Sequence, residues 1–455
     1  MEKQNLGSHD ATVMDNDSFF ALSAIDNPFK TPLTQSRVGS RAASIHSSAA
    51  VSYVSGTFSK YIPDRRTSSQ NFEAPVRPPR QRKFKSARLM GTYDKPWTQN
   101  KDPRMVWDKV FFWGLALVGL GVGAYIIYTG WNSVENPSYC LMFEDDFSNG
   151  INDKDWNYEV ELSGYGSGSF DWTTKDEKNA YADEKGLHIV PTVTTEATNI
   201  NVTQTLNGYT LNLTAEGVCT SSDPLDCVRV SNSTTGSVIN PVRSARLTTK
   251  GKHSITYGKV EVVAKLPKGS WLWPAIWMMP EDSVYGGWPA SGEIDIMESK
   301  GNDGSSYRGG RNLVGGTLHW APQAVLDAFY RTSGVRYLKR NDYSDSFHTY
   351  AVEWSENYIY TWVDSRIALD PWSVTGRYNT PFDEAFYLIL NVAVGATNGY
   401  FTEGYRNKPW VDGSETAAKQ FLESQPAWEP TWGEGDTRGM TVQSVKMFSR
   451  GVCGA

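Results

Sequence analysis

Short runs of alternating apolar and polar residues recur through the C-terminal two-thirds of the chain, separated by Gly, Asn, Asp and Pro. Successive side chains of a β-strand point to opposite faces, so this alternation is typical of strands with one buried face. The clearest runs are GLHIVPTV (186–193), GKVEVVAKL (258–266), HTYAVEW (348–354), YIYTWVD (358–364) and AFYLILNVAV (385–394). The pattern predicts one all-β domain, a sandwich or a barrel, over residues 136–455.

One run has no alternation of apolar and polar residues. Val110–Gly130, VFFWGLALVGLGVGAYIIYTG, contains 21 residues without a charge. A helix needs roughly 20 apolar residues to cross a bilayer core, and Trp and Tyr lie toward both ends, as in the aromatic belts of membrane proteins. We therefore predict one transmembrane helix over residues 105–131. A buried core helix is the alternative, but such helices are rarely apolar on all sides.

Charge divides the chain at this helix. Residues 1–104 are net basic and the remainder is net acidic, within an overall charge of −6. Because basic residues mark the cytoplasmic flank of a membrane span, the N-terminus is predicted to be cytoplasmic and residues 136–455 luminal or extracellular. This is a type II single-pass topology, in the secretory pathway or plasma membrane. The acidic C-terminal part argues against nucleic acid as a partner.

Residues 1–104 are rich in Ser, Pro and basic residues and show no sustained hydrophobic period. Such a composition predicts a disordered tail. Two roles remain open, a simple solvated tail and a sorting or phosphorylation platform whose basic end touches anionic lipid.

Features typical of secreted proteins lie after the predicted helix. Three glycosylation sequons begin at Asn201, Asn212 and Asn232. The four cysteines are Cys140, Cys219, Cys227 and Cys453. Four cysteines allow three pairings; we favour Cys219–Cys227 as a short loop and Cys140–Cys453 as a link between the ends of the domain. Free buried thiols are the alternative.

The segment SGEIDIMESKG, from Ser291, places three carboxylates in an otherwise apolar run. Glu293 and Asp295 share one face of a strand, whereas Glu298 falls on the other face if the alternation is regular. One extra residue, a β-bulge at about Ile296–Met297, returns Glu298 to the acidic face. At about 3.3 Å per residue the Cα atoms of the two Glu residues are then roughly 13 Å apart. Their carboxyl groups would lie roughly 5–6 Å apart, close to the spacing of about 5–5.5 Å in retaining glycosidases.

Two carboxyl groups at this separation suit retaining cleavage of a glycosidic bond. One attacks the anomeric carbon, and the other protonates the leaving oxygen and later activates water. These tasks require different pKa values at one pH, and Asp295 on the same face can shift the protonation of a neighbouring Glu. The motif alone leaves a solvated acidic strand and a metal site as alternatives.

Four tryptophans, Trp271, Trp273, Trp277 and Trp288, lie within the 22 residues before Glu293. Aromatic rings that stack on sugar rings are expected beside glycosidase acids. Some of these tryptophans are expected in the core and at least two in a cleft.

Several motifs together resemble glycoside hydrolase family 16, in its laminarinase-like endo-1,3(4)-β-glucanase group. In order they are FEDDF (143–147), SARLTTKGKHSITYGKVEVVAKLPKGSWLWPAIWMMP (244–280), GEIDIMES (292–299), GGTLHW (315–320), FHTYAVEW (347–354) and FYLILNVAVGATNG (386–399). The resemblance implies a jelly-roll β-sandwich of the concanavalin A-like type, with an open cleft on its concave face. It also implies retaining hydrolysis or transfer of β-1,3-linked glucan.

The resemblance also implies roles for individual residues. On the family pattern Glu293 is the nucleophile, Glu298 the acid/base and Asp295 the assisting carboxylate, and the spacing with the bulge is the laminarinase type. His319 in GGTLHW matches a cleft histidine. The expected sugar-binding tryptophans are Trp273, Trp288 and Trp277. No cofactor and no catalytic metal are expected, and a structural calcium ion is left open.

Two features depart from secreted laminarinases. The anchor and tail resemble those of type II membrane members associated with fungal cell-wall glucan assembly. A long insert, residues 195–236, carries all three sequons and either flanks one end of the cleft or only decorates a loop.

Three functions compete. The first is a membrane-anchored endo-β-1,3(4)-glucanase that remodels cell-wall or surface glucan, and the second is a glucan transglycosylase. The third is a non-catalytic β-glucan-binding protein, which the presence of both glutamates disfavours. In each case the predicted partners are β-glucan and a membrane.

Overall fold

The structure, a computed structural model, describes residues 90–99, 102–133, 137–327, 329–373, 381–405, 407–451 and 453. Two parts are described separately, the segment up to Ser133 and the folded domain from residue 137 onward. Most of the predicted tail lies outside the described residues, so its disorder stays a prediction.

The first part contains a short helix, α1 (Pro96–Gln99), and a long one, α2 (Arg104–Ser133). None of the 30 residues of α2 is buried. At about 1.5 Å per residue such a helix is roughly 45 Å long, which exceeds the hydrocarbon thickness of about 30 Å. By length and composition, α2 is the one helix among the described residues that could cross a membrane.

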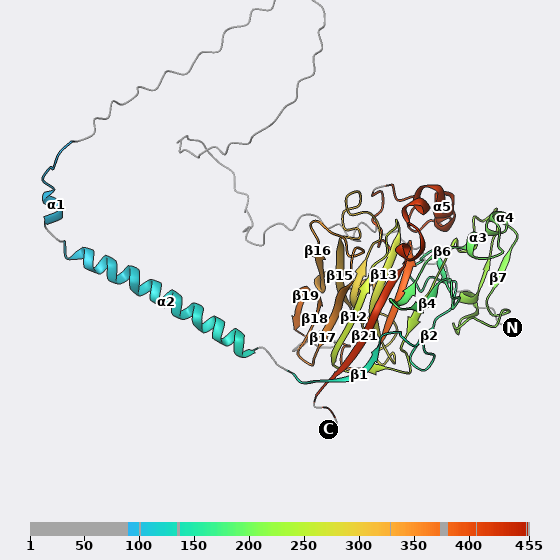
Figure 1. The fold of residues 1–455 in the computed structure, drawn as a ribbon, viewed down its shortest axis with the longest axis horizontal. Helices are drawn as coiled ribbons and strands as arrows, with labels where there is room; N and C mark the ends of the chain where they lie inside the picture. Colours follow the sequence, from blue (N-terminus) through green and yellow to red (C-terminus); the bar gives the residue numbers. More distant parts are fainter. Residues whose placement is uncertain are drawn as a thin grey trace, which may run out of the picture. The chain divides into compact units, whose positions relative to one another are not determined.

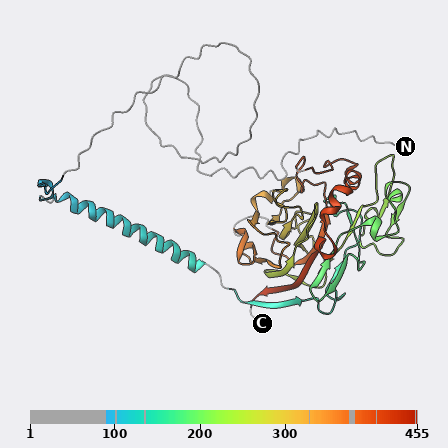
Figure 2. The same cartoon turned by 45° about the horizontal axis from the view of Figure 1, so that its top comes forward.

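The folded domain consists mainly of two antiparallel sheets of eight strands each, seen as layers in Figures 1 and 2. The first sheet has the order β19-β18-β17-β12-β21-β5-β4, and β1 pairs with β21 beside this path. Its strands are β1 (Tyr139–Asp145), β4 (Ala180–Asp183), β5 (Gly186–Ile189), β12 (Gly258–Lys265), β17 (His348–Trp354), β18 (Tyr358–Val363), β19 (Arg366–Ser373) and β21 (Met440–Arg450).

The second sheet carries the acidic motif. Its order is β16-β15-β14-β13-β20-β10-β2, with β11 paired to β20. Its strands are β2 (Asn157–Tyr158), β10 (Arg246–Thr248), β11 (Ser254–Ile255), β13 (Leu272–Pro280), β14 (Glu293–Ser299), β15 (Leu313–His319), β16 (Ser333–Tyr337) and β20 (Phe386–Val394).

Smaller elements complete the domain. A three-stranded sheet contains β3 (Asp171–Thr173), β6 (Thr192–Val193) and β9 (Val242–Ser244), and a two-stranded sheet contains β7 (Thr210–Asn212) and β8 (Val228–Val230). The short helices are α3 (Thr194–Ala197), α4 (Val202–Leu206), η1 (Pro224–Cys227), η2 (Ala324–Leu326), η3 (Phe329–Arg331), α5 (Ala417–Glu423), α6 (Gln425–Trp428), η4 (Glu429–Thr431) and η5 (Gly435–Arg438). The predicted all-β sandwich is therefore confirmed, and all five predicted runs contain strands.

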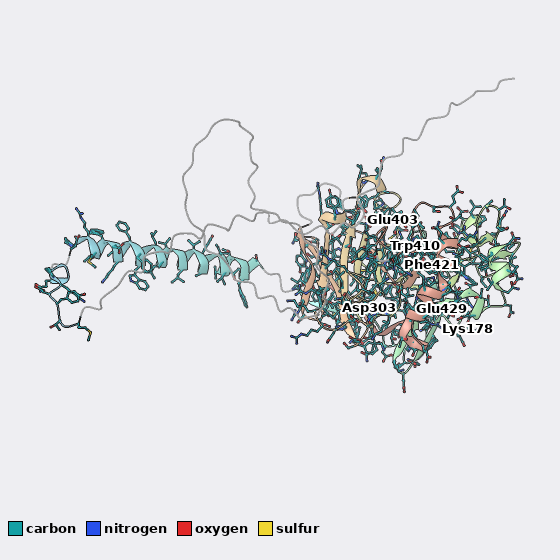
Figure 3. The ribbon with its side chains drawn as sticks, turned by 90° about the horizontal axis from the view of Figure 1, so that it is seen from above. Lys178, Asp303, Glu403, Trp410, Phe421 and Glu429 are labelled. Atoms are coloured by element: carbon teal, nitrogen blue, oxygen red, sulfur yellow. A yellow bond between two sulfur atoms is a disulfide. The ribbon has the colours of Figure 1, made fainter. Side chains whose placement is uncertain are left out.

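The core fills the space between the two large sheets. In β12 every second residue is buried, as the alternation predicted, whereas β20, in the middle of the second sheet, is buried along nearly its whole length. Aromatic rings extend the core toward α5, where Trp410 meets Phe421 edge-on at 5.6 Å and Phe421 stacks on Trp428 at 4.5 Å. Figure 3 labels Trp410 and Phe421 within the domain.

The predicted β-bulge is present in β14. On the β15 side, Asp295 pairs with Thr317 and Glu298 with Gly315, so two residues of β14 oppose one of β15. On the β13 side the register shifts at the same place. Ile296 and Met297 are both buried in the core. The bulge at Ile296–Met297 therefore lets both face the core while Glu298 returns to the other face.

The insert is a small folded unit at the edge of the sandwich, in which α3, α4 and β7 lie together (Figure 1). It has its own apolar cluster, in which Leu211, Leu213 and Ile200 pack against Leu162 and Trp172. A disulfide between Cys219 and Cys227 closes a loop within it. The second disulfide joins Cys140 to Cys453, so both expected pairings are present.

The sequon residues lie on the surface of the insert. Asn201 and Asn232 are exposed and Asn212 is half-buried. The Asn201 side chain also accepts a hydrogen bond from the Gln204 N–H at 2.9 Å, which caps α4. Their glycosylation stays a prediction.

Deletion of Ile296 tests the bulge. Without the extra residue, Glu298 would turn into the core, where an unpaired charge costs on the order of several kcal/mol. We expect the free energy of unfolding in urea to fall by that amount. The control Ile296→Val keeps the strand length and should cost only about 0.5–1.5 kcal/mol. Equal losses for the two variants would show that the bulge is not what holds Glu298 out of the core.

Candidate active site

A cavity of about 960 Å³ lies against the face of the second sheet that carries the acids. It crosses the sheet from β15 to β10 and continues along the segment that follows β2. Glu293, Asp295 and Glu298 all line it, as the bulge predicted. The separation of their carboxyl groups stays a prediction.

Glu298, near the C-terminal end of β14, is half-buried and lines this cavity. Burial raises the pKa of Glu298, against the opposing charge of His319 and a hydrogen bond from Trp273. The Trp273 Nε1–H donates to Glu298 Oε1 at 2.9 Å. The Trp273 ring in turn stacks on Tyr400 at 3.8 Å, almost parallel to it. The stacking on Tyr400 therefore fixes the position of the indole whose N–H donates to Glu298.

Glu293 lies at the other end of the same strand. It is likewise half-buried and accepts a hydrogen bond from the Trp288 Nε1–H. Trp273 and Trp288, predicted only as sugar platforms, thus each donate an N–H to one of the two glutamates.

Asp295 lies between the two glutamates and is 2% exposed. Burial, together with the charges of Glu293 and Glu298, raises the pKa of Asp295 well above its usual range. His319 opposes this effect, because its Nε2 lies 3.3 Å from Asp295 Oδ2. Asp295 therefore favours the protonated form more strongly than an exposed aspartate would.

His319 is held between two aspartates. Its Nδ1 lies 2.5 Å from Asp327 Oδ2, on the side away from Asp295. Burial alone lowers the pKa of His319, but the hydrogen bonds to Asp295 and Asp327 raise it to about 12. These contacts favour the positively charged imidazole, which lies beside Glu293, its pairing partner in the neighbouring strand.

The same cluster bears on the alternative of a metal site. Glu293, Asp295 and His319 offer ligand atoms within 4.8 Å of one another. A ligating histidine needs a free nitrogen, whereas both ring nitrogens of His319 lie against carboxylate oxygens, Nε2 at 3.3 Å from Asp295 and Nδ1 at 2.5 Å from Asp327. The donor set therefore fits acid–base chemistry better than metal binding.

The cavity extends from the acids toward β10. The Trp277 Nε1–H donates to Asn391 Oδ1 at 2.8 Å, and Trp277 lines the cavity. The Arg246 guanidinium lies 4.7 Å from the Trp277 ring and 3.9 Å from the Tyr165 ring, between two aromatic surfaces. In contrast, Trp271 is buried in the core, as expected for some of the four tryptophans.

Several residues of the cavity were not identified from the sequence. Asn391 had a signal, because it is the one polar residue in the apolar run of β20. Lys300 directly follows the acidic motif without lining the cavity, and burial lowers its pKa to about 8. Tyr400, Arg246 and Asp327 lie in segments that only the folded chain brings to the acids, and no local pattern marked them.

The insert reaches the cavity. Asp226, in η1, lines its far end beyond β10. Of the two alternatives left open for residues 195–236, the structure therefore supports the first, in which the insert flanks one end of the cleft.

The chain is similar to known proteins in sequence and in structure. A family model described as glycosyl hydrolases family 16 matches residues 191–388. A laminarinase catalytic domain from Thermotoga maritima has 25% identity and a TM-score of 0.47, covering 69% of this chain and 98% of its own. A glucan endo-1,3-beta-glucosidase from Cryptopygus antarcticus is 32% identical, over 65% of this chain and 93% of the relative.

A beta-1,3-glucan-binding protein from Penaeus monodon is similar over a comparable length. The two chains are 38% identical over 336 residues, which make up 68% of this chain and 90% of the relative. The relatives thus include proteins named for hydrolysis and proteins named for binding. Identity at this level over nearly the whole relative, together with the matching family model, shows that the chain belongs to glycosyl hydrolase family 16.

Proposed function

We propose that this protein is a retaining endo-β-glucanase that acts on β-1,3-linked glucan, with mixed β-1,3/1,4-glucan as a further substrate. One observation carries the proposal: two glutamates of one strand line the same cavity, and burial raises the pKa of one of them, Glu298. A retaining glycosidase requires such a pair, one group ionised and the other protonated at the same pH.

The charges around the pair support this division of roles. The raised pKa of Glu298 favours its acid form, which can protonate the leaving oxygen. Glu293 lies beside His319 and accepts the Trp288 N–H, and as the other carboxyl group of the pair it is the one that attacks the anomeric carbon. With Asp295 also held toward its neutral form, the strand does not carry three adjacent negative charges.

Two steps follow from these roles. In the first, Glu293 forms a bond to the anomeric carbon while Glu298 gives its proton to the departing sugar oxygen. In the second, Glu298, now ionised, takes a proton from water as the water oxygen displaces Glu293. A sugar hydroxyl in place of water gives transglycosylation, so this activity is the second candidate for the same site.

A purely glucan-binding protein is the third candidate, because close relatives carry that name. Binding alone does not require two glutamates on one face of a strand, one of them with a raised pKa. Both acids are present and line the cavity here, and this observation supports catalysis.

We further propose that α2 anchors the protein in a membrane, with the tail in the cytoplasm and the sandwich in the secretory lumen or outside the cell. The apolar surface of α2 and its length support the anchor. The two disulfides and the surface sequons support an oxidising, glycosylating compartment. This arrangement would place the cavity where cell-wall or surface glucan is built.

Substitution of each glutamate tests the roles. Wild-type protein should shorten β-1,3-gluco-oligosaccharides, whereas longer products would identify the transglycosylase and unchanged substrate the binding protein. Glu293→Gln should abolish turnover, since an amide cannot form the glycosyl ester. Glu298→Gln should lose activity on glucan, by a factor of about 10²–10⁴, but retain it on substrates with a good leaving group. Azide should then restore turnover and give a β-glycosyl azide.

The opposite azide result would reverse the assignment. A β-glycosyl azide formed by Glu293→Gln, or an α-glycosyl azide formed by Glu298→Gln, would make Glu298 the nucleophile, because azide takes the place of whichever group has been removed. Asp295→Asn should lose less activity than either glutamate variant, because Asp295 makes no bond to the sugar.

The Trp273→Phe variant tests the origin of the acid pKa. The indole N–H stabilises the ionised form of Glu298, so its loss raises the pKa of Glu298 further. The acid form then persists to higher pH, and the alkaline limb of the kcat/KM profile should move to higher pH. Trp277→Phe is the matched control, because its N–H donates to neutral Asn391. An alkaline limb that stays in place in Trp273→Phe, or that moves equally in the control, would contradict this assignment.

Membrane topology is tested on sealed vesicles. External protease should remove the basic tail of the full-length protein and spare the sandwich. Treatment with an N-glycosidase should increase its gel mobility, and the triple variant Asn201→Gln, Asn212→Gln, Asn232→Gln should already migrate at the faster position. Protection of the tail with loss of the sandwich would refute the orientation.

A further inference from the structure

Beyond β10 the second sheet continues only as the two-residue strand β2. The cavity reaches past this edge, where Glu161, Ser163 and Tyr165 line it from one side and Asp226 from the other. Three strand steps at about 4.8 Å place β10 roughly 14 Å from β14 across the sheet. The floor of this stretch is the stack of Trp277, Arg246 and Tyr165 described above.

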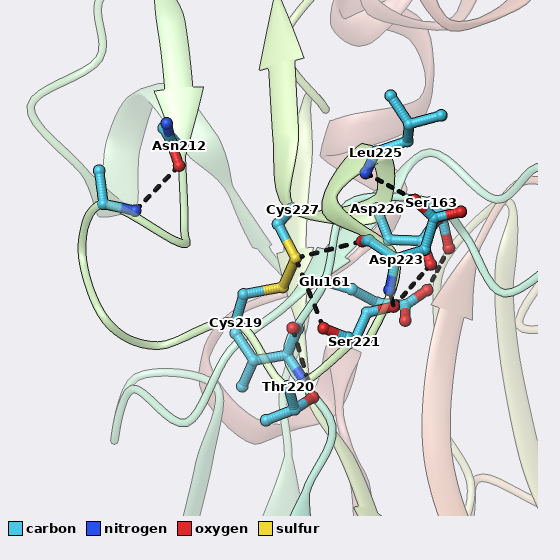
Figure 4. The surroundings of a disulfide bond; sticks show 12 residues. Glu161, Ser163, Asn212, Cys219, Thr220, Ser221, Asp223, Leu225, Asp226 and Cys227 are labelled. Carbon is cyan, nitrogen blue, oxygen red and sulfur yellow. Dashed lines mark hydrogen bonds between the residues drawn. A yellow bond between two sulfur atoms is a disulfide. The ribbon is translucent and has the colours of Figure 1, made fainter.

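The end of the cavity is built by two segments that hold each other in place. The Leu162 N–H donates to the Asp226 carbonyl at 2.7 Å, and the Arg229 Nη2 donates to the Leu162 carbonyl at 3.1 Å. At the other end of the loop the Thr220 N–H donates to the Val160 carbonyl at 3.0 Å. The Cys219–Cys227 disulfide closes this loop, and Figure 4 shows Glu161, Ser163 and Asp226 beside it.

Glu161 and Asp226, which form the wall at this end of the cavity, can each accept further hydrogen bonds from a ligand. Glu161 accepts a hydrogen bond from the Ser163 hydroxyl on Oε1, and Asp226 accepts one from the Ser221 hydroxyl on Oδ2 at 2.7 Å. A carboxylate has two oxygens and about four acceptor sites. Each group therefore retains acceptor capacity, and both line the cavity. Acceptors at the end of an aromatic floor suit the hydroxyl groups of a sugar ring, which are donors.

We infer that Glu161 and Asp226 form a terminal sugar subsite, which binds the end unit of a β-glucan chain by its hydroxyl groups and sets the length of the fragment between this wall and Glu293. The inference rests on the proposed function for its substrate class. The insert then determines specificity, because it contributes Asp226 and fixes the position of Glu161 through Leu162.

Binding of a ladder of β-1,3-gluco-oligosaccharides of increasing length tests this subsite. The full-length protein is used in detergent with Glu293→Gln, which prevents turnover. Affinity should rise with length until the chain reaches the wall and then level off. Asp226→Asn and Glu161→Gln should each weaken binding roughly tenfold, the effect of one hydrogen bond to a charged group. The loss should appear only for oligosaccharides at or above the length at which affinity levels off.

The shorter oligosaccharides report whether the variants are folded, because their binding near Glu298 should not change. Glu216→Gln is the matched control, since Glu216 is an exposed acid of the same insert that does not line the cavity. Equal affinities of Asp226→Asn and this control along the whole ladder would overturn the subsite. If binding depends on length as expected but protein with the native Glu293 does not turn over the oligosaccharides, the subsite stands and the proposed glucanase activity is refuted. If that protein does turn them over but Asp226→Asn leaves binding unchanged, the glucanase activity stands and the subsite is refuted.

Discussion

The site depends on one constraint, that three acidic side chains must share one face of a strand whose other face is packed in the core. A regular strand cannot satisfy it, since Glu298 lies five positions after Glu293, and side chains an odd number of positions apart point to opposite faces. The bulge resolves the conflict by sending two consecutive apolar residues, Ile296 and Met297, into the core. Core packing and the position of Glu298 therefore depend on each other, because a shift in the register of β14 would move the core residues and Glu298 together.

Burial then makes the three acids chemically unequal. Asp295 is buried and Glu298 is half-buried, and burial raises the pKa of each. Two contacts act against this rise: His319 lies against Asp295, and the Trp273 N–H reaches Glu298. A strand of three identical exposed acids would titrate together, whereas these surroundings favour the proton-donor form of Glu298.

The sequence could predict those features that depend on a few consecutive residues. The strands and the bulge were visible because alternation and its violation are properties of a few consecutive residues, and α2 because an uncharged run is conspicuous. The partners of the acids were not visible. Tyr400 lies 127 positions after Trp273, on which it stacks, and Asp327 reaches His319 from a loop. Their roles depend on side-chain packing between distant segments, which no local period records. For the tryptophans the sequence predicted proximity to the acids, but not that the indole N–H groups of Trp273 and Trp288 would point at them.

The β10 end of the cavity is held in place by different interactions from its centre. At the centre, β13 and β14 are held by the main core, so a change in Glu293 or Glu298 geometry would require repacking of the sandwich. At the β10 end, the wall is held by backbone hydrogen bonds to Val160 and Leu162, a small separate apolar cluster and a disulfide. This unit has its own apolar cluster and disulfide, separate from the core between the large sheets. On the proposed function, a chain with the same acidic strand but another insert would therefore select a different length of glucan at the same two glutamates.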